Sequence, residues 1–384
     1  MDFNLNDEQQ MLRDAAARFV RERYDFETRR KLSEGAGWSS DLWRQYADMG
    51  WLGLTVPEAD GGLGCSFIET AIVAEELGRG IALEPFVAVA VLASRLLEKA
   101  TASAFEGRRA ELLAGLIEGQ VRVLPALYEP QSRWDVLQPR TVARRRGDGW
   151  TLSGTKLLVE AAPSATHYIV SARVGDAAGE LGLFLVDASA LEIAPYELID
   201  GTRSADLRLD EFAVGADALL VEPHLGAEVL DEALDRAALA HVAEALGSME
   251  SVLDITSDYI KTRQQFGQPI GKFQALQHRM AEMFVEVQET RSILLRGIAH
   301  LDASPAERRL AVSAAKVMLG KAARFVGGQG IQLHGGIGVT DEYQVGHYYK
   351  RLLLLDKRYG DSDWHLDRFV AARRTIDASQ RTDR

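Results

Sequence analysis

Two Gly-marked breaks interrupt strongly helical sequence and organise the rest of the chain: Thr262-Arg263-Gln264-Gln265-Phe266-Gly267-Gln268-Pro269-Ile270-Gly271-Lys272-Phe273-Gln274 and Gln332-Leu333-His334-Gly335-Gly336-Ile337-Gly338. The first break holds an arginine and amides where a helix ends, and the second holds a Gly-Gly pair after a glutamine. Helix ends and tight glycine turns leave backbone N–H groups without partners, and a guanidinium is a strong phosphate donor. The two breaks therefore predict a site for an anionic ligand such as the pyrophosphate of a dinucleotide.

Composition and charge restrict the classes of protein to consider. The chain has 384 residues, of which 47% are hydrophobic and 26% charged, which is enough for two or three packed domains. Its net charge of −12 argues against nucleic acid or an anionic membrane as a partner, because phosphate backbones are bound by clustered Lys and Arg. Cys65 is the single cysteine, so neither an intrachain disulfide nor a Cys-based metal cluster is expected.

The N-terminal segment carries no targeting signal. Met1–Glu8 is acidic and lacks the basic and apolar regions of a signal peptide, and no run of about 18 apolar residues could span a bilayer. We therefore predict a cytoplasmic protein that holds no metal and does not cross a membrane.

Helical patterns fill the first 120 residues. Asn6 or Asp7 can cap a first helix, a second is expected from Ser40 to Gly50, and a long apolar helix from Ser66 to about Leu77. The apolar face of the first helix is predicted to contain Met11, Leu12, Ala15, Phe19 and Val20.

The pattern changes to period two between residues 121 and 225, which indicates strands in a small antiparallel barrel or sandwich. The clearest runs are Thr141–Arg144, Trp150–Gly154, Tyr168–Ala172 and Leu183–Val186, with a hairpin turn through Arg146-Gly147-Asp148-Gly149. Long helices return over 226–262, 272–301, 305–331 and 342–373. A sheet inserted between helical regions gives a natural cleft where the layers meet.

Several motifs in combination resemble the acyl-CoA dehydrogenase family over nearly the whole chain. They are Leu54-Thr55-Val56-Pro57-Glu58, Gly154-Thr155-Lys156, Arg263-Gln264-Gln265-Phe266-Gly267, His278-Arg279-Met280-Ala281-Glu282-Met283 and Gln332-Leu333-His334-Gly335-Gly336-Ile337-Gly338-Val339-Thr340-Asp341-Glu342-Tyr343. The resemblance implies an α+β flavoprotein with an N-terminal helical domain (1–120), a central antiparallel β-barrel domain (121–225) and a C-terminal four-helix bundle (226–384). It also implies FAD as cofactor and an acyl-CoA substrate.

The resemblance carries over a set of residues that hold the ADP and pyrophosphate half of an FAD seated mainly in the neighbouring subunit of a dimer of dimers. These residues are Arg263, Phe266, Gln274, Gln332, Gly335 and Gly336. Their chemistry agrees, since a guanidinium suits a pyrophosphate and glycines allow close backbone approach. The alternative is structural: Arg263 caps a helix and the glycines only make a turn.

The flavin-ring side departs from the family pattern. There the family has a Thr-Glu-Pro followed by a small Gly/Ser-rich loop, whereas this chain has Tyr128-Glu129-Pro130-Gln131-Ser132-Arg133-Trp134-Asp135. A loop that admits a flat ring needs small residues, so this seat is predicted to be altered or lost.

The catalytic carboxylate departs as well. Dehydrogenation needs a base for the α-proton of the thioester, which the family carries in a Tyr-Glu-Gly segment. Here the segment reads Tyr359-Gly360-Asp361, with Gly360 at the place of the Glu. Asp361, one residue later, is a candidate base or a solvated turn residue. A second position that the family uses for the base falls at Ala237.

Glu244 is the other candidate base. At intervals of three and four, Ala237, Ala240, His241, Glu244 and Ser248 share one helix face. Among Ala and Leu, a carboxylate is expected to be desolvated with a raised pKa, as a base near neutral pH requires. The alternative is a buried Glu paired with His241 or Arg236.

Two main hypotheses follow. In the first, the chain resembles the small subunits of paired bacterial dehydrogenases for dicarboxylic or steroid side-chain acyl-CoA, in lipid or steroid catabolism, and a paralogous partner supplies the flavin seat and base of a heterotetramer. In the second, the chain is catalytically complete with Glu244 as the base. An electron-transfer flavoprotein or a similar acceptor is expected in either. A flavin monooxygenase or oxidase on the same fold and a non-enzymatic assembly subunit stay open as alternatives.

Overall fold

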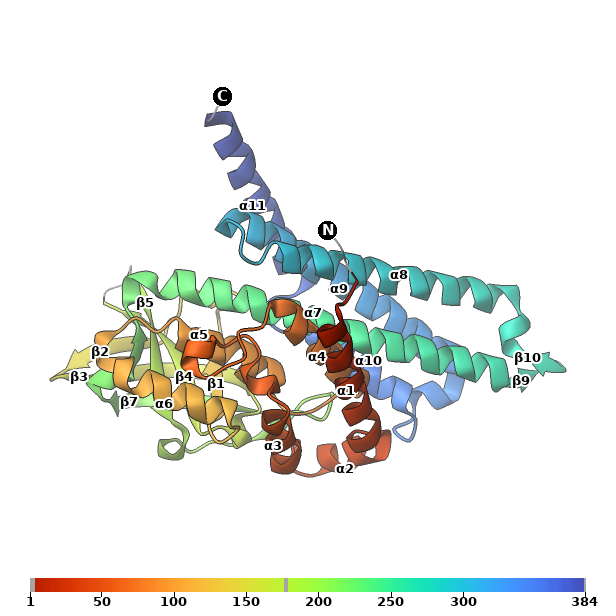
Figure 1. Cartoon of the computed structure of the whole chain (residues 1–384), viewed down its shortest axis with the longest axis horizontal. Helices are drawn as coiled ribbons and strands as arrows, with labels where there is room; N and C mark the ends of the chain where they lie inside the picture. Colours follow the sequence, from red (N-terminus) through yellow and green to blue (C-terminus); the bar gives the residue numbers. More distant parts are fainter. Residues whose placement is uncertain (1–3, 176–178, 383–384) are drawn as a thin grey trace. The chain divides into compact units, whose positions relative to one another are not determined.

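The computed structural model describes residues 4–175 and 179–382, so the first three residues of the acidic N-terminal segment lie outside the described part of the chain. The elements follow one another in the order helices, strands, helices (Figure 1). Contacts between residues divide the chain into two compact units. One comprises the described parts of Met1–Arg30, Ala71–Ala82 and Ala238–Arg384, and the other comprises Lys31–Thr70 and Leu83–Ala237. The division into 1–120, 121–225 and 226–384 stays a prediction.

The unit that contains the C-terminal residues is helical. Its elements are α1 (Asp7–Arg23), part of α2 (Phe26–Glu34), most of α4 (Phe67–Arg79), α7 (Pro223–Thr262) beyond residue 237, β9 (Gln264–Gln265), β10 (Gln268–Pro269), η8 (Ile270–Lys272), α8 (Gln274–Ala299), α9 (Pro305–His334), η9 (Gly335–Val339), α10 (Gln344–Lys357) and α11 (Ser362–Thr382). None of the helices in residues 4–175 and 179–382 is both long and apolar enough to cross a membrane.

The first helix begins where the sequence predicts, but its buried face is turned. Asn6 caps α1 through a reciprocal capping box with Gln9. Phe19 and Val20 are buried as predicted, whereas Met11 is 72% exposed and Ala15 is exposed too. Ala16 takes the buried position instead, because a helix face repeats at three and four residues and Ala16 is spaced in this way from both Phe19 and Val20.

Two helices of this unit, α4 and α7, cross at backbone contact. A Cβ atom built on Gly78 would overlap the carbonyl oxygen of Glu244, and one built on Gly247 would overlap that of Glu75. Only hydrogen fits at either position. Nearby, Glu75 binds Arg291 of α8 at 3.0 Å, so an ion pair flanks the apolar crossing.

The predicted last helix, 342–373, is two helices. The break falls between α10 and α11 at Tyr359 and Gly360, which have φ angles of 55° and 107°. Helical backbone cannot pass through two consecutive residues of positive φ. This break is the segment in which the resemblance places the catalytic carboxylate.

The other unit is built on a sheet of eight strands within the described residues. Its order is β6-β7-β3-β2-β4-β5-β8, with β1 also paired to β4. The strands are β1 (Val123–Ala126), β2 (Val142–Arg146), β3 (Gly149–Glu160), β4 (His167–Val174), β5 (Glu180–Asp187), β6 (Tyr196–Glu197), β7 (Arg203–Val214) and β8 (Leu219–Val221). The four predicted strand runs lie in β2 to β5, and the β2–β3 hairpin turns at Gly147 and Asp148 as predicted.

The predicted small antiparallel barrel or sandwich differs from the observed sheet in its strand directions and in its closure. Strands β1 and β2 both run parallel to β4, so the sheet is mixed. Among the described residues, no pairing joins β6 to β8, and the ladder is open. The α+β class is confirmed.

Short helices complete this unit: α3 (Ser40–Asp48), η1 (Trp51–Gly53), η2 (Glu58–Asp60), the π-helix η3 (Val87–Ala93), α5 (Ser94–Glu98), η4 (Ser103–Phe105), α6 (Glu106–Ile117), η5 (Ala162–Ser164), η6 (Ala188–Ala190) and η7 (Ala216–Ala218). The helix predicted from Ser40 is α3, with Ser39 as its cap. All seven residues of η3 are buried.

Candidate functional site

The first break folds into a hairpin that protrudes beyond the end of α7 (Figure 1). Strands β9 and β10 pair antiparallel, and the two residues between them, Phe266 and Gly267, both have positive φ, at 54° and 78°. Two consecutive residues of positive φ define the type I′ turn that suits a two-residue hairpin. Phe266 at this tip is 90% exposed and meets Phe273 edge-on at 6.0 Å. A large aromatic ring is thus held out toward solvent.

Donor groups around the hairpin have no partner in the chain itself. Among the described residues, the guanidinium of Arg263 makes no hydrogen bond or ion pair, and the side-chain amides of Gln274 and Gln332 make none either. Gln274 opens α8, and the residue before it, Phe273, provides no side-chain cap. The N–H groups of Gln274 and Ala275 therefore also stay available to a ligand, whereas those of Leu276 and Gln277 donate to the carbonyl of Phe273.

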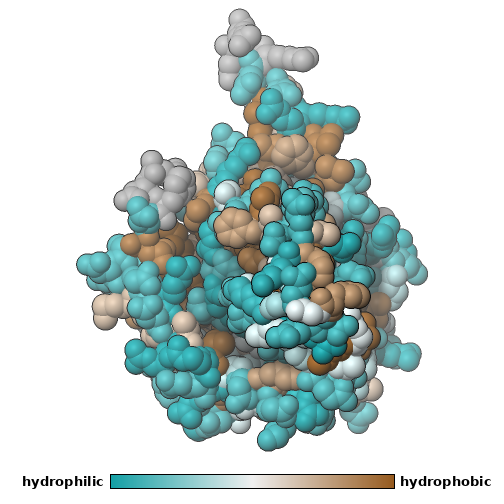
Figure 2. All heavy atoms as spheres, turned by 90° about the vertical axis from the view of Figure 1, so that its right-hand side faces the viewer, coloured by the Kyte–Doolittle hydropathy of each residue, from teal (hydrophilic) through white to brown (hydrophobic). Residues whose placement is uncertain are grey.

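The second break is an open glycine turn. Helix α9 ends at His334, and Gly335 follows with φ 64° and ψ −138°, a conformation that glycine adopts at little cost. A Cβ atom built on Gly335 or Gly336 meets nothing within 4 Å. All six residues that the resemblance assigns to the cofactor are exposed. Figure 2 looks onto the side from which the hairpin protrudes and shows hydrophilic side chains with hydrophobic ones between them.

The two breaks are joined in space through Tyr259. Its backbone carbonyl accepts a hydrogen bond from Arg263 N–H at 2.8 Å, and its hydroxyl donates to the carbonyl of His334 at 3.3 Å. Tyr259 and His334, which lie 75 positions apart in sequence, thus bring both breaks onto one surface. We call this surface, formed by Arg263, Phe266, Gln274, Gln332, Gly335 and Gly336, the cradle.

The cradle fits the ADP and pyrophosphate half of FAD. A cation without an internal partner, helix N–H groups and two glycines in open space match an anionic group, and an exposed aromatic ring and amides match an adenosine. The described residues contain no group of His, Cys, Asp and Glu that could hold a metal ion.

The loop expected to seat the flavin ring lies in the other unit and is held by a buried ion pair. Glu129 accepts hydrogen bonds from Lys156 Nζ and Thr141 Oγ1, each at 2.6 Å, and Lys156 is fully buried. Burial lowers the pKa of Lys156 to about 8, against the opposing charge of Glu129. The Glu-Pro and Gly-Thr-Lys motifs are therefore structural partners.

Bulky side chains occupy that loop. Tyr128 meets Trp134 edge-on at 5.7 Å, and the indole N–H of Trp134 is buried without a hydrogen-bond partner among the described residues. Ser132 is the one small polar residue in 128–135, and its hydroxyl is bound to the backbone of Glu129. That the flavin seat is altered stays a prediction.

Glu244 is buried as predicted, but its pKa moves in the opposite direction. Burial raises the pKa of this carboxyl, yet the charge of Arg351 and the hydrogen bond from His241 outweigh burial and lower it to about 2. Arg351 lies at 2.6 Å from Oε1, and His241 Nδ1 lies at 2.9 Å from Oε2. The expected pairing with His241 is present, whereas Arg236 pairs with Glu232 instead. A carboxylate held in this way is a poor proton acceptor at neutral pH.

Asp361 is a buried cap, not a solvated turn residue. It is 8% exposed, its Oδ1 accepts from Trp364 N–H at 3.0 Å at the start of α11, and its Oδ2 lies 3.2 Å from Lys357 Nζ. Both oxygens are engaged. The neighbouring Gly360 has no room for a side chain, because a Cβ atom there would lie 2.6 Å from the ring of Trp364 and 2.8 Å from that of His365.

The sequence does not predict three residues that hold the cradle, Glu244 and the end of α10 in place. Tyr259 joins the breaks, Arg351 holds Glu244, and Lys316, fully buried, donates to the carbonyls of Leu355, Asp356 and Arg358. A charged residue on the apolar face of a predicted helix is a usable signal, because such a group needs a buried partner. The partner of Arg351 is 107 residues away, which periodicity cannot reveal.

Comparison with known proteins identifies the class. Residues 6–120, 126–212 and 224–373 match the family descriptions "Acyl-CoA dehydrogenase, N-terminal domain", "Acyl-CoA dehydrogenase, middle domain" and "Acyl-CoA dehydrogenase, C-terminal domain". The chain therefore belongs to the acyl-CoA dehydrogenase family. This is a family of FAD-dependent oxidoreductases, so the cofactor and the enzyme class implied by the resemblance are confirmed.

Individual relatives span the whole chain. A probable acyl-CoA dehydrogenase of Bacillus subtilis, YngJ, is 29% identical over 98% of this chain and 100% of its own length. The chain is similar to a Tcur3481-Tcur3483 steroid ACAD variant, with 30% identity, a TM-score of 0.86 and coverage of 97% of this chain and 99% of that one. It is also similar to a chain of the ChsE4-ChsE5 complex from Mycobacterium tuberculosis, with 25% identity, a TM-score of 0.86 and coverage of 97% and 98%.

Proposed function

We propose that this protein catalyses the FAD-dependent α,β-dehydrogenation of an acyl-CoA thioester as one subunit of a heteromeric assembly. In that assembly the cradle holds the ADP and pyrophosphate half of an FAD whose flavin ring and catalytic base lie mainly in a paralogous partner subunit. FAD held by the cradle would supply a hydride acceptor for the β-carbon of the thioester, and a base would remove the α-proton. An electron-transfer flavoprotein or a similar acceptor then takes the electrons.

One contrast supports the proposal. All six cradle residues are exposed, whereas the carboxylates that could act as a catalytic base within this chain are either absent or already bound to other residues of the chain. Arg263 and the amides of the cradle have no internal partners among the described residues. Glu244 and Asp361, the two candidate carboxylates, are both bound within the chain, and Gly360 lacks a carboxylate. A chain that retains only the residues for the ADP and pyrophosphate half of a neighbour's FAD is suited to an assembly of unlike subunits, in which the partner supplies the flavin-ring site and the base.

The solved relatives support a heteromer. The chain resembles members of two complexes that pair different chains, one of them a steroid dehydrogenase. Carried over to this chain, they favour an acyl-CoA with a large acyl group, in lipid or steroid breakdown. The cytoplasmic location suggested by the single cysteine, Cys65, belongs to the same proposal.

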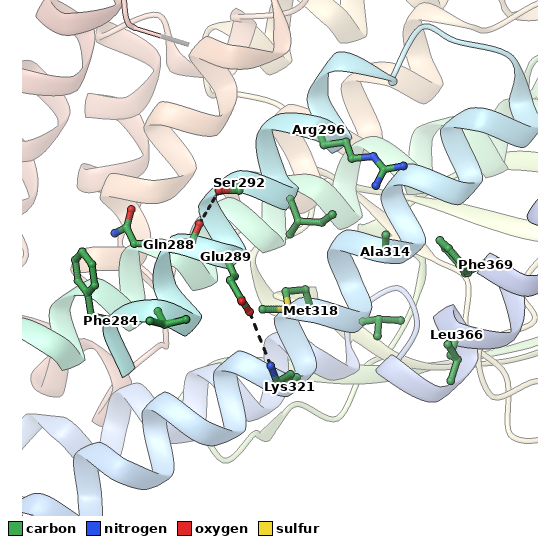
Figure 3. Close-up of a pocket in the computed structure, with 13 residues that line it drawn as sticks. Phe284, Gln288, Glu289, Ser292, Arg296, Ala314, Met318, Lys321, Leu366 and Phe369 are labelled. Carbon is green, nitrogen blue, oxygen red and sulfur yellow. Dashed lines mark hydrogen bonds and ion pairs between the residues drawn. The ribbon is translucent and has the colours of Figure 1, made fainter. Parts of the chain in front are cut away.

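An apolar groove supports association through the helical unit (Figure 3). The groove, of about 750 Å³, lies between α8, α9 and α11. Phe284 and Leu366 at its two ends are 53% and 51% exposed, and Met318 lies between them. Lys321 at its edge pairs with Glu286 at 2.9 Å and lies 3.9 Å from Glu289, which leaves the floor apolar. Exposed apolar surface of this kind is typical of a subunit interface, and a dimer of dimers offers one.

A flavin absorbance spectrum tests the proposal. The chain expressed alone is expected to be colourless, and the chain co-expressed with its paralogous partner to be yellow and to bleach anaerobically with an acyl-CoA thioester. If the lone chain holds stoichiometric FAD and is bleached by the thioester, the heteromeric proposal is wrong and the catalytically complete enzyme is right. If no thioester bleaches either preparation, the dehydrogenase reaction itself is wrong.

A further inference from the structure

We propose that Tyr259 is a positioning residue that locks the two halves of the cradle into one preformed dinucleotide site. This inference rests on the proposed function, because it concerns how the chain presents its half-site to FAD. The two halves are the hairpin that carries Arg263 and the glycine turn that carries Gly335 and Gly336.

On the hairpin side, Tyr259 lies in the last turn of α7. Its carbonyl accepts the backbone N–H of Arg263 at 2.8 Å and the hydroxyl of Thr262 at 3.2 Å. These bonds fix the point at which the chain leaves the helix. Just beyond, the N–H of Ile270 binds the carbonyl of Arg263 at 2.8 Å and closes the base of the hairpin. The direction in which the Arg263 side chain leaves the backbone is thereby set.

On the turn side, Tyr259 holds the last residue of α9. Its hydroxyl donates to the carbonyl of His334 at 3.3 Å, and its ring lies 4.4 Å from the His334 ring at an angle of 31°. The His334 ring is held in turn by a hydrogen bond from Nδ1 to the carbonyl of Gly330 at 2.7 Å and by Tyr343, whose ring is 5.0 Å away. Gly335 follows directly, so the open turn starts from a fixed atom.

A second hydrogen bond joins the flanking helices, from Arg279 of α8 to Gln329 of α9 at 2.8 Å, but neither residue belongs to the hairpin or to the glycine turn. The hairpin is otherwise held by its own strands and by the contact of Phe266 with Phe273. The turn is held from its far side, where Thr340 Oγ1 donates to the carbonyl of Ile337 at 3.1 Å. The Tyr259 hydroxyl therefore links the hairpin, which carries the guanidinium, directly to the start of the glycine turn.

A preformed site binds more tightly because less ordering is needed on binding. Loss of the hydroxyl removes one neutral hydrogen bond, which is about 1 kcal/mol, so we expect FAD affinity to fall by roughly fivefold. The ring stays in place in Tyr259→Phe, so the fold is retained. Tyr343→Phe is the matched control, because the Tyr343 hydroxyl makes no hydrogen bond with a described residue.

The experiment uses the FAD-binding assembly of this chain with its co-expressed partner, and the probes are FAD and ADP. Tyr259→Phe is expected to weaken both by about the same factor, since both engage the cradle, with the spectrum of bound flavin unchanged. Tyr343→Phe is expected to leave both affinities unchanged. Equal affinities in Tyr259→Phe and wild type overturn the inference. If the wild-type assembly itself binds neither probe, the proposed function is wrong and the inference falls with it.

A double-mutant cycle separates positioning from loss of stability. Arg263→Gln and Gln332→Ala lie on opposite halves, and their effects on FAD affinity are expected to be non-additive while Tyr259 couples them. In the Tyr259→Phe background the two effects are expected to add. A coupling that persists in that background contradicts the role of Tyr259, whereas a purely structural role lowers the Tm without changing the coupling.

Discussion

Glu244 shows how one buried residue changes the interpretation of the site. Periodicity places it correctly on the His241 face of α7, and burial by itself raises its pKa, as a base requires. Arg351 reverses that outcome, because a cation at 2.6 Å stabilises the ionised form more than burial destabilises it. Whether a buried carboxyl has a raised or a lowered pKa thus depends on its charged partner. For Glu244 this partner, Arg351, lies on α10, a helix distant in sequence.

Glu244→Gln is therefore expected to destabilise the fold more than it affects catalysis. The change leaves Arg351 buried without its counter-ion, which costs about 3 kcal/mol at neutral pH. Because the folded pKa, about 2, lies below the ordinary 4.5, the stabilisation is fully present above pH 4.5 and fades as the pH falls toward 2. The difference between wild type and variant in urea unfolding should thus shrink between pH 5 and 3.

The matched control is the exposed Glu342→Gln, which should behave as wild type at every pH. Equal stability of Glu244→Gln and wild type at pH 7 would falsify the buried ion pair.

Gly360→Glu is expected to fail as a repair of the missing base. The new Cβ would lie within 2.8 Å of both aromatic neighbours, Trp364 and His365, at a φ of 107° that favours glycine. We expect a Tm lower by several degrees and no gain in flavin bleaching by acyl-CoA. Gly107→Glu on α6, where nothing lies within 4 Å, should leave the Tm close to that of wild type. A stable Gly360→Glu protein with new activity would show that the turn can accept the carboxylate.

At the scale of elements, the positions of helices and strands follow from local sequence patterns. Some of their ends and pairings depend instead on contacts with residues that are distant in sequence. The capping pattern at Asn6 and the β2–β3 turn at Gly147 and Asp148 are local, and both are confirmed. The sequence does not predict the break at Tyr359 and Gly360, because the break depends on contacts of its carbonyls. Lys316 of α9 holds the carbonyl of Arg358, and His365 of α11 holds that of Tyr359. The parallel pairing of β1 with β4 likewise depends on a distant strand.

The crossing of α4 and α7 gives a test of an element contact. Gly247→Ala puts a methyl group onto the carbonyl oxygen of Glu75, so the helices must separate. We expect a loss of at least about 2 kcal/mol in the free energy of unfolding, typical of overpacking in a tight core. Gly328→Ala in α9 is the control, because nothing lies within 4 Å and alanine favours a helix by up to about 1 kcal/mol. Equal stabilities of the two variants would contradict backbone contact at the crossing.

At the scale of the whole molecule, the sequence locates the two breaks that the structure brings together, but it does not show how the protein uses them. The cradle residues can be read from motifs because glycines, an arginine and helix ends have a direct chemical meaning, and the structure brings both breaks together. The fate of the chain's own reaction centre cannot be read in this way. It depends on Arg351 and on the room around Gly360, which are properties of packing.

Mutations in the cradle and mutations in the loop 128–135 should therefore have unequal effects in the proposed assembly. Arg263→Gln removes the cation of the cradle and is expected to lower bound FAD and acyl-CoA turnover together by roughly tenfold or more, since a charge-assisted bond contributes about 1.5–3 kcal/mol. Arg146→Gln, an exposed arginine on β2, is the control for a change of charge. Trp134→Gly changes the loop expected to seat a flavin ring in this chain and should leave FAD content and turnover unchanged. The proposal is contradicted if Trp134→Gly lowers FAD content and turnover and Arg263→Gln lowers neither. That result means that the loop of this chain seats the flavin ring and that the cradle binds no FAD.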